Sequence, residues 1–252
     1  MRVSAVVISH GDADELAASL PALSAQVDEL VVIANVPGSV GDVPPGARVL
    51  HNATPEGFAA NANRGVAQTS GEFVVLANPD AVPEDGAVST LHAFAASRPR
   101  CGIAGPRMLG VDGEIVPSRR TFPTVRGTLV RRTPMRRLRP PLTRQRDHYN
   151  LDDDPEEPAQ ADWLLGGFLF IRRAALDELG GFDAGFRLYG EDIDLCYRAA
   201  RAGWERWYVP GAVVRHEWKR ETDVRFFTRR TLWHWRGIAR FVRKHPETLG
   251  RL

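Results

Sequence analysis

The sequence is poor in cysteine: Cys101 and Cys196 are the only two in 252 residues. Both lie in apolar surroundings, which favours two buried thiols in a reducing compartment over a disulfide. The sequence also lacks the cysteine spacing of a structural zinc site. We therefore expect a hydrophobic core to hold the fold, and the chain is long enough to bury one.

Long hydrophobic runs are absent as well. The apolar run at residues 3–9 follows a single basic residue and is too short for a signal peptide or a membrane span. No later stretch has enough consecutive apolar residues to cross a bilayer. Internal repeats and clear interdomain linkers are missing too. These absences predict a cytoplasmic protein with one large domain or two small ones.

The first half of the chain alternates apolar runs with segments of helical periodicity. The apolar runs predict strands at residues 3–9, 29–34, 47–51, 73–77 and 102–105. The periodic segments predict helices opened by residues 11–14, at 57–68 and at 88–97, the first with a kink or early break at Pro21. This alternation predicts a parallel α/β sheet with crossover helices. Ligands of such sheets bind beyond the carboxyl ends of the strands, here the loop after Ser9 and the turn Asn78-Pro79-Asp80.

The second half predicts shorter elements. Strands are expected at residues 163–171, 207–209 and 212–215, and a short helix at 174–179. Gly166 and Gly167 interrupt the first of these strands, which suggests that a ligand approaches the backbone there. The apolar residues that follow Asp192 recur at helical spacing as far as Gly203. Glu191 and Asp192 therefore stand at the start of a helix, where acids can simply cap it and complement its dipole.

Positive charge is concentrated in the middle of the chain. Residues 117–148 carry ten arginines and a single acid, Asp147, and residues 151–158 carry the opposite charge. These stretches are either solvated loops that neutralise each other or a basic lip for a pyrophosphate or a membrane surface. From residue 223 a helix is predicted that mixes aromatic residues with arginines. It would either pack on its own domain or lie at a membrane interface.

Several motifs stand in a familiar order along the chain. They are residues 6–10, 56–65, 76–81, 163–167, 180–183, 190–198, 202–204 and 209–216. In order and spacing they resemble the inverting family 2 glycosyltransferases, and most of all the bacterial rhamnosyltransferase-like branch. The resemblance covers most of the chain from Val3 to about Asp223. It implies the GT-A fold, a Rossmann-like α/β mixed sheet flanked by helices. The GT-A domain would span residues 1–222, with a nucleotide-binding half at about 1–110 and an acceptor half at about 111–222. A basic aromatic helical tail would follow at 223–252.

The resemblance also implies a reaction. A sugar, for example rhamnose, would pass with inversion from a nucleoside-diphosphate sugar (dTDP or UDP) to a cell-envelope glycan or a polyprenyl-diphosphate-linked acceptor. A divalent cation, Mg²⁺ or Mn²⁺, would neutralise the leaving diphosphate. A lipid-linked acceptor would bring the protein into peripheral contact with the inner face of the cell membrane.

Site residues follow from the matching positions. The resemblance implies that Asp192 is the catalytic base with Glu191 beside it, and that Asp80 holds the cation with His216 nearby. From local pattern alone, Asp80 belongs to a strand-ending turn and His216 is a structural histidine. Candidates for donor binding are Ser9, His10, Asn35, Asn61, Arg64, Asn78 and Asp80. Candidates for the acceptor and sugar side are Trp163, Gly166 and Gly167. Arg198 is interpreted as a surface charge.

One physical question stays open for Asp192. A helix N-terminus lowers the pKa of a carboxylate, whereas burial and the neighbouring Glu191 raise it. An efficient base needs the pKa raised. The sequence does not decide which influence is larger.

The chain departs from the family pattern in the donor site. Ala34-Asn35 stands where the family usually has Asp-Asn, with the Asp touching the base, and His10-Gly11 stands in place of Tyr-Asn. The donor is therefore left open, and a non-catalytic domain that binds a sugar nucleotide or a glycan is an alternative. A nucleotidyltransferase is another, although no Gly-rich, Lys-bearing triphosphate loop follows the first strand. The arginines suggest a nucleic-acid binder, but no recognition motif supports one, and no nucleic-acid partner is expected.

Overall fold

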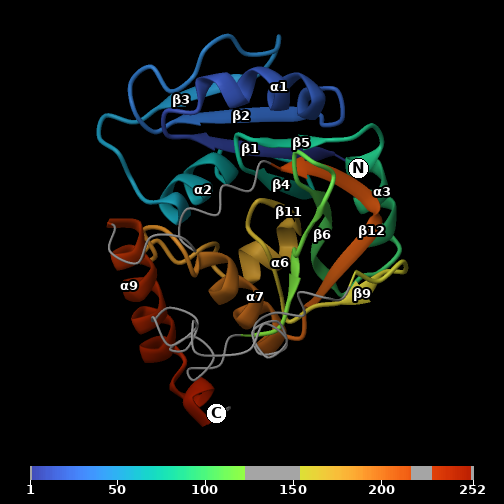
Figure 1. Cartoon of the computed structure of the whole chain (residues 1–252), viewed down its shortest axis with the longest axis vertical. Coiled ribbons are helices and arrows are strands. Elements are labelled where there is room, and N and C mark those ends of the chain that lie inside the picture. The colour runs from blue at the N-terminus through green and yellow to red at the C-terminus, as the bar shows by residue number, and fades with distance from the viewer. Residues whose placement is uncertain (1, 123–153, 217–228, 251–252) are drawn as a thin grey trace.

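The computed structural model describes residues 2–122, 154–216 and 229–250. In this part of the chain a ten-stranded mixed sheet has its main strands in the order β3-β2-β1-β4-β11-β6-β12-β5. Helices cover both faces of the sheet (Figure 1). Most of the basic stretch 117–148, the start of the acidic stretch 151–158 and the beginning of the predicted tail lie outside the described residues.

The N-terminal half is built as predicted, from parallel strands. β1 (Val3–Ser9) pairs in parallel with β2 (Glu29–Ala34) and β4 (Phe73–Ala77), and β2 pairs with β3 (Arg48–His51). α1 (Ala13–Ser24) and α3 (Ala87–Ala96) pack on one face of the sheet, and α2 (Phe58–Val66) on the other. These strands read as continuous apolar runs because helices bury them on both faces.

The sequence predicted a kink or an early break at Pro21, and the break is wrong, because α1 continues to Ser24. Pro21 has no N–H to bond to the Ala17 carbonyl, but both residues lie on the exposed side of the helix, where water can satisfy that carbonyl. Leu20 and Leu23 are buried on the other side. Their burial holds the helix across the proline.

The second half makes the sheet mixed, so a purely parallel sheet is also a wrong prediction. β11 (Phe168–Arg172) runs antiparallel between β4 and β6 (Cys101–Leu109), a strand longer than expected. β12 (Glu205–His216) is parallel to β6 and antiparallel to β5 (Ala81–Pro83). The remaining short strands are β7 (Ile115–Val116), β8 (Arg119–Arg120), β9 (Ala159–Gln160) and β10 (Trp163–Leu164). β8 and β10 form a separate two-stranded sheet.

Two strand predictions need correction. The expected strand 163–171 is two strands, β10 and β11, because residues 166–167 form a turn between them. The two strands expected at 207–209 and 212–215 are one, β12, which passes Pro210 with a register shift. A shift of this kind lets a strand continue past a residue that cannot donate to the ladder.

The C-terminal helix packs on the rest of the chain. α9 (Arg229–Lys244) and the 3₁₀ turn Pro246–Gly250 lie against α7 (Glu191–Arg201), which follows the short helix α6 (Arg173–Glu178). Asp194 of α7 is fully buried and accepts from Lys244 Nζ at 2.9 Å and His245 Nε2 at 2.8 Å. Phe241 packs on Tyr197 and Phe186. One face of the tail helix is therefore occupied by its own domain.

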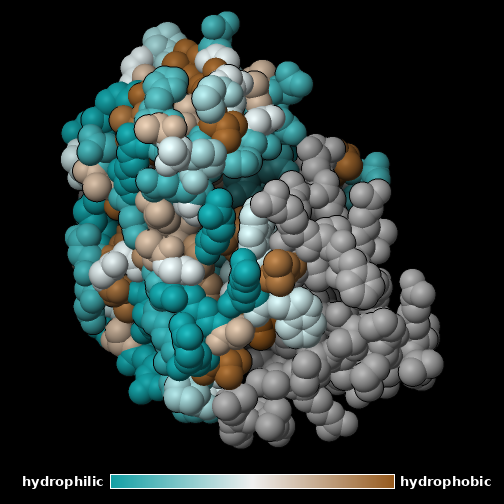
Figure 2. Space-filling view, turned by 90° about the vertical axis from the view of Figure 1, so that its left-hand side faces the viewer, coloured by the Kyte–Doolittle hydropathy of each residue, from teal (hydrophilic) through white to brown (hydrophobic). Residues whose placement is uncertain are grey.

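Cys101 and Cys196 are free and buried, as predicted, and burial raises the pKa of each thiol to about 12. Within the described ranges, no helix has the length and apolar character needed to span a bilayer. The coloured residues on the face seen in Figure 2 are mostly hydrophilic, with hydrophobic residues scattered among polar ones. Scattered exposed apolar residues are ordinary for a protein surface.

Candidate active site

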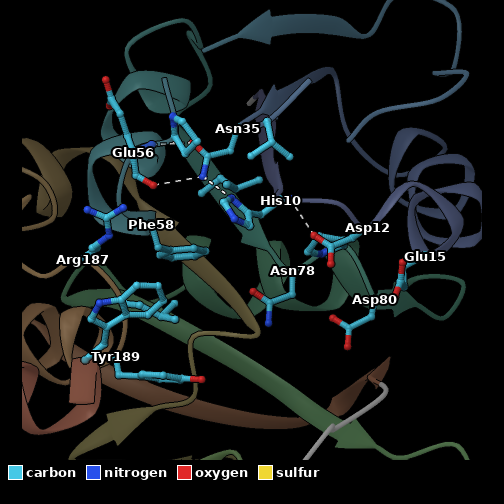
Figure 3. Close-up of a pocket in the computed structure, with 16 residues that line it drawn as sticks. His10, Asp12, Glu15, Asn35, Glu56, Phe58, Asn78, Asp80, Arg187 and Tyr189 are labelled. Carbon is cyan, nitrogen blue, oxygen red and sulfur yellow. Dashed lines mark hydrogen bonds between the residues drawn. The ribbon is translucent and has the colours of Figure 1, made fainter. Parts of the chain in front are cut away.

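A cavity of about 780 Å³ opens beyond the carboxyl ends of β1, β2 and β4 (Figure 3). Its polar lining comprises His10, Asp12, Glu15, Asn35, Glu56, Asn78, Asp80, Arg187 and Tyr189. Its apolar lining comprises Ile8, Val36, Pro55, Phe58, Pro79, Leu188 and Trp233. The cavity thus lies where the general rule for α/β sheets places a ligand.

Asp80 and His216 meet at one end of this site. Residues 78–81 form the predicted turn after β4, and β12 ends at His216, directly opposite Ala81 of β5. His216 Nε2 lies 3.4 Å from Asp80 Oδ1 and 3.2 Å from Asn78 Nδ2. A Cβ on Gly167 would lie 3.0 Å from His216 Nε2, so a larger residue there would crowd the imidazole.

This pair fits a divalent cation in its chemistry. A carboxylate oxygen and an imidazole nitrogen at 3.4 Å are close enough to be neighbouring ligands of one ion. Among the described residues no cluster of three or more His, Cys, Asp or Glu side chains could hold a metal by itself. Two protein ligands suit Mg²⁺ or Mn²⁺ that is completed by phosphates and water.

Asp192 lies beside Gly166, and the next residue, Gly167, lies beside His216 of this pair. The chain enters α7 through Tyr189 (φ 70°) and Gly190 (φ 96°), a left-handed turn that places Asp192 in the first turn of the helix. Its Oδ2 accepts from the Gly166 N–H at 3.1 Å, and its Oδ1 accepts from the Ile193 N–H at 2.9 Å. The glycine pair therefore approaches two side chains, Asp192 through Gly166 and His216 through Gly167.

Burial has the largest influence on the pKa of Asp192. It raises the pKa of Asp192, against backbone N–H donors and Arg120, which lower it. Burial also raises the pKa of Glu191 to about 8, and the negative charge of Asp192 adds to that rise. A charge on Asp192 thus favours the protonated form of its neighbour Glu191.

A family model, "Glycosyltransferase like family 2", matches residues 3–235 of the chain. The chain belongs to glycosyltransferase family 2. One curated relative is the N-acetylglucosaminyl-diphospho-decaprenol L-rhamnosyltransferase of Mycobacterium tuberculosis, which is 34% identical over 184 residues. The match covers 68% of this chain and 59% of that protein, so the chain spans little more than half of its relative's length.

Solved structures show that this family 2 chain has the GT-A fold. The crystal structure of GalNAc-T7 with UDP, GalNAc and Mn²⁺ superposes with a TM-score of 0.66 at 17% identity, covering 99% of this chain and 51% of that one. The mannosyltransferase PcManGT from Pyrobaculum calidifontis, in complex with GDP-Man and Mn²⁺, superposes with a TM-score of 0.55 at 17% identity. The match covers 85% of this chain and 56% of that one. The two proteins were crystallised with different nucleotides, so the fold alone does not select a base.

Of the predicted site residues of this family 2 chain, His10, Asn35, Asn78 and Asp80 line the cavity and nine do not. Five of the nine lie beside the turn that carries Asp80 or next to that group: Gly166, Gly167, Glu191, Asp192 and His216. The other four make contacts elsewhere. Ser9 Oγ donates to the Ser39 carbonyl, and Trp163 is buried with its Nε1 donating to the Thr121 carbonyl at 2.8 Å. Asn61 is fully buried behind the cavity, and Arg64 donates to Asn52. Their roles in binding donor or acceptor stay predictions.

Arg198 is not a surface charge as expected. Its Nε donates to Asp194 Oδ2 at 2.7 Å, and its other nitrogens donate to the carbonyls of Leu179 and Gly181. Helical spacing from Asp194 to Arg198 was the available signal, since residues four apart face each other. Arg198 therefore holds α7 to the turn after α6.

Sequence reasoning missed the residues that close the cavity from the C-terminal side. Arg187, Leu188 and Tyr189 come from the loop before α7, and Trp233 comes from α9. The Arg187 guanidinium lies over the Trp233 ring, 5.5 Å from its centroid. No local pattern pairs a loop with a helix more than forty residues later, so only the packing of α9 reveals this wall.

Proposed function

We propose that the chain is a metal-dependent inverting glycosyltransferase that moves a sugar from a nucleoside-diphosphate sugar to an acceptor hydroxyl. The observation that carries the proposal is the glycine pair 166–167, which abuts Asp192 with one residue and His216 with the next. A base and a group suited to a diphosphate-bound cation thus flank one short backbone segment. A displacement reaction needs both at a single sugar carbon.

In the proposed reaction, the acceptor oxygen attacks the anomeric carbon from the face opposite the leaving diphosphate. The carbon–oxygen bond to the diphosphate breaks, the new glycosidic bond forms, and Asp192 takes the hydroxyl proton. Its raised pKa makes Asp192 a stronger base, and the Gly166 N–H orients it. A cation held by Asp80 and His216 would neutralise the departing diphosphate.

The donor and acceptor are proposed from the relative. Its name describes transfer of L-rhamnose to N-acetylglucosaminyl-diphospho-decaprenol. We infer a dTDP- or UDP-linked sugar, rhamnose first among them, and a polyprenyl-diphosphate-linked or other cell-envelope acceptor for this chain.

The test is an assay of product formation from dTDP-rhamnose and a polyprenyl-diphosphate N-acetylglucosamine, with NMR of the product to determine its anomer. Wild type should form the inverted linkage. Asp192→Asn should lower turnover by about 10²- to 10⁴-fold, because a general base contributes on that scale, while donor affinity is kept. Unchanged turnover in Asp192→Asn would remove the base assignment, and a retained anomer would contradict the mechanism.

A lipid-linked acceptor also implies work at a membrane surface on the cytoplasmic side. The tail supports this in part, because Leu232, Arg236 and Arg243 are exposed on one side of α9, away from the face that packs on α7. Co-sedimentation with vesicles that contain anionic lipid should exceed that with neutral vesicles and should fall on Arg236→Glu/Arg243→Glu substitution. Equal binding to both kinds of vesicle would contradict an electrostatic contact.

A further inference from the structure

Four side chains at the back of the cavity form one hydrogen-bonded relay: Arg64, Asn52, Asn35 and His10. A guanidinium can only donate, so the contact from Arg64 identifies the Asn52 atom that it meets as the amide oxygen. The Asn52 amide nitrogen then donates to Asn35 Oδ1 at 2.8 Å and to Asn61 Oδ1 at 2.7 Å. Both hydrogens of Asn52 are used.

The orientation of Asn35 is determined independently by the backbone of Glu56. The Glu56 N–H donates to Asn35 Oδ1 at 2.9 Å, and Asn35 Nδ2 donates to the Glu56 carbonyl at 3.1 Å. The second hydrogen of that nitrogen faces Nδ1 of His10 at 2.9 Å, so Nδ1 has to accept it. A neutral imidazole carries one ring proton, which is therefore on Nε2.

We propose that the relay holds His10 as an Nε2–H donor that recognises a carbonyl oxygen of the donor's nucleobase, uracil or thymine. This rests on the proposed function, which puts the diphosphate at Asp80. His10 and Phe58 lie at the other end of the cavity (Figure 3), where the Phe58 ring offers a stacking face. Uracil and thymine present two carbonyl oxygens to this donor, whereas adenine presents only ring nitrogens and an amino group, so we expect the donor to favour the pyrimidines.

The relay explains how the chain can do without the family's Asp. Ala34 occupies that position and is buried, with 3% of its surface exposed. Asn35 is also unavailable to the base, since His10, Asn52 and Glu56 engage both ends of its amide. His10 is exposed and lines the cavity, and the relay engages its Nδ1, so its Nε2 is the group that meets the base. Arg64 and Asn52 act through it as positioning residues.

The experiment is calorimetric binding of UDP, dTDP and ADP with Mn²⁺ to the full chain and two variants. In His10→Gln an amide N–H replaces Nε2–H, and in His10→Asn the amide reaches only to the Nδ1 position. Wild type and His10→Gln should bind UDP and dTDP about five- to tenfold more tightly than ADP, the size of one hydrogen bond between neutral groups. His10→Asn should lose that preference and keep its affinity for ADP.

Nitrogen NMR of the His10 ring gives a second readout that needs no ligand. The free protein should show a protonated Nε2 and a bare Nδ1, and Asn35→Asp should reverse this, because a carboxylate can only accept. A wild type with protonated Nδ1 would overturn the relay. Metal-dependent binding that is equal for all three nucleotides overturns the inference and leaves the proposed function standing. If no nucleoside diphosphate binds, the proposed function fails and the inference fails with it.

Discussion

At the residue scale, two adjacent acids are given different states by their surroundings. Glu191 is buried, and Asp192 is half-buried but accepts two backbone N–H bonds. Helix position alone would lower the pKa of both carboxyls, because the dipole favours negative charge there. Burial outweighs the dipole and raises both. The Gly166 N–H then supports the charge on Asp192, the proposed base.

Glu191 should make stability depend on pH. Its folded pKa of about 8 lies above the ordinary value of 4.5, so the folded state holds a proton that the unfolded state has lost between these values. The stability that the protonated acid supports is complete below pH 4.5 and is lost as the pH rises through about 8. Glu191→Gln removes this loss. The melting temperature of the variant should gain on wild type from pH 5 to pH 9 by at least about 2–4 °C. A constant difference across that range would contradict the raised pKa.

At the element scale, α9 acts as a clamp on the loop that carries Arg187 and Tyr189. His234 stacks on the Tyr189 ring with centroids 5.3 Å apart, and Gly237 packs against the Tyr189 carbonyl. Arg240 and Lys244 continue the same face and bind Asp183 at 2.7 and 2.8 Å. Burial alone would raise the pKa of Asp183, but these two donors hold it well below its ordinary value.

Gly237 tests this clamp. A Cβ at this position would overlap the Tyr189 carbonyl oxygen, so Gly237→Val should push α9 away from the loop. We expect a loss of about 2–10 °C in melting temperature and weaker donor binding measured by calorimetry. Ala239→Val is the control, because it also places a valine in α9, but on the exposed side of the helix. If both variants bind donor like wild type, α9 does not shape the site.

At the scale of the whole molecule, the mixed sheet assembles the site from distant segments. β5 and β12 pair antiparallel, which sets His216 opposite Ala81 and so beside Asp80. β11 between β4 and β6 brings the glycine turn to the same edge. The Asn78 N–H donates to the Gly167 carbonyl at 2.9 Å and joins the two loops. Sheet order thus concentrates the proposed cation ligands and the proposed base.

A double-mutant cycle on Asp80→Ala and His216→Ala examines that convergence. Each single change should weaken metal-dependent donor binding by at least about tenfold, measured by titration with and without chelator. Because both side chains would serve one ion, the losses should not add, and the coupling energy should be about 1 kcal/mol or more. Additive losses would mean that the two residues act separately.

The sequence alone was sufficient for the family and for most local elements. Its motifs predicted the GT-A fold, the parallel strands β1 to β4 and the helix that begins at Glu191, and these are confirmed. Apolar runs and helical periodicity are local consequences of burial, so they can be read without coordinates. At Pro21 the helical spacing of apolar residues competed with the helix-breaking tendency of proline. The helix continues because Leu20 and Leu23 are buried.

Tertiary structure decided what depends on contacts between distant residues. The raised pKa of Asp192 follows from its burial, which the helical spacing of apolar residues in the sequence does not reveal. The turn at Gly166-Gly167 replaces a continuous strand because its neighbours, Asp192 and His216, arrive from later elements. Asn61 and Arg64 lie behind the cavity, and Trp233 of the tail lines it. Local sequence determines which backbone conformations are low in free energy, whereas only the packing of the whole chain determines which side chains share a site.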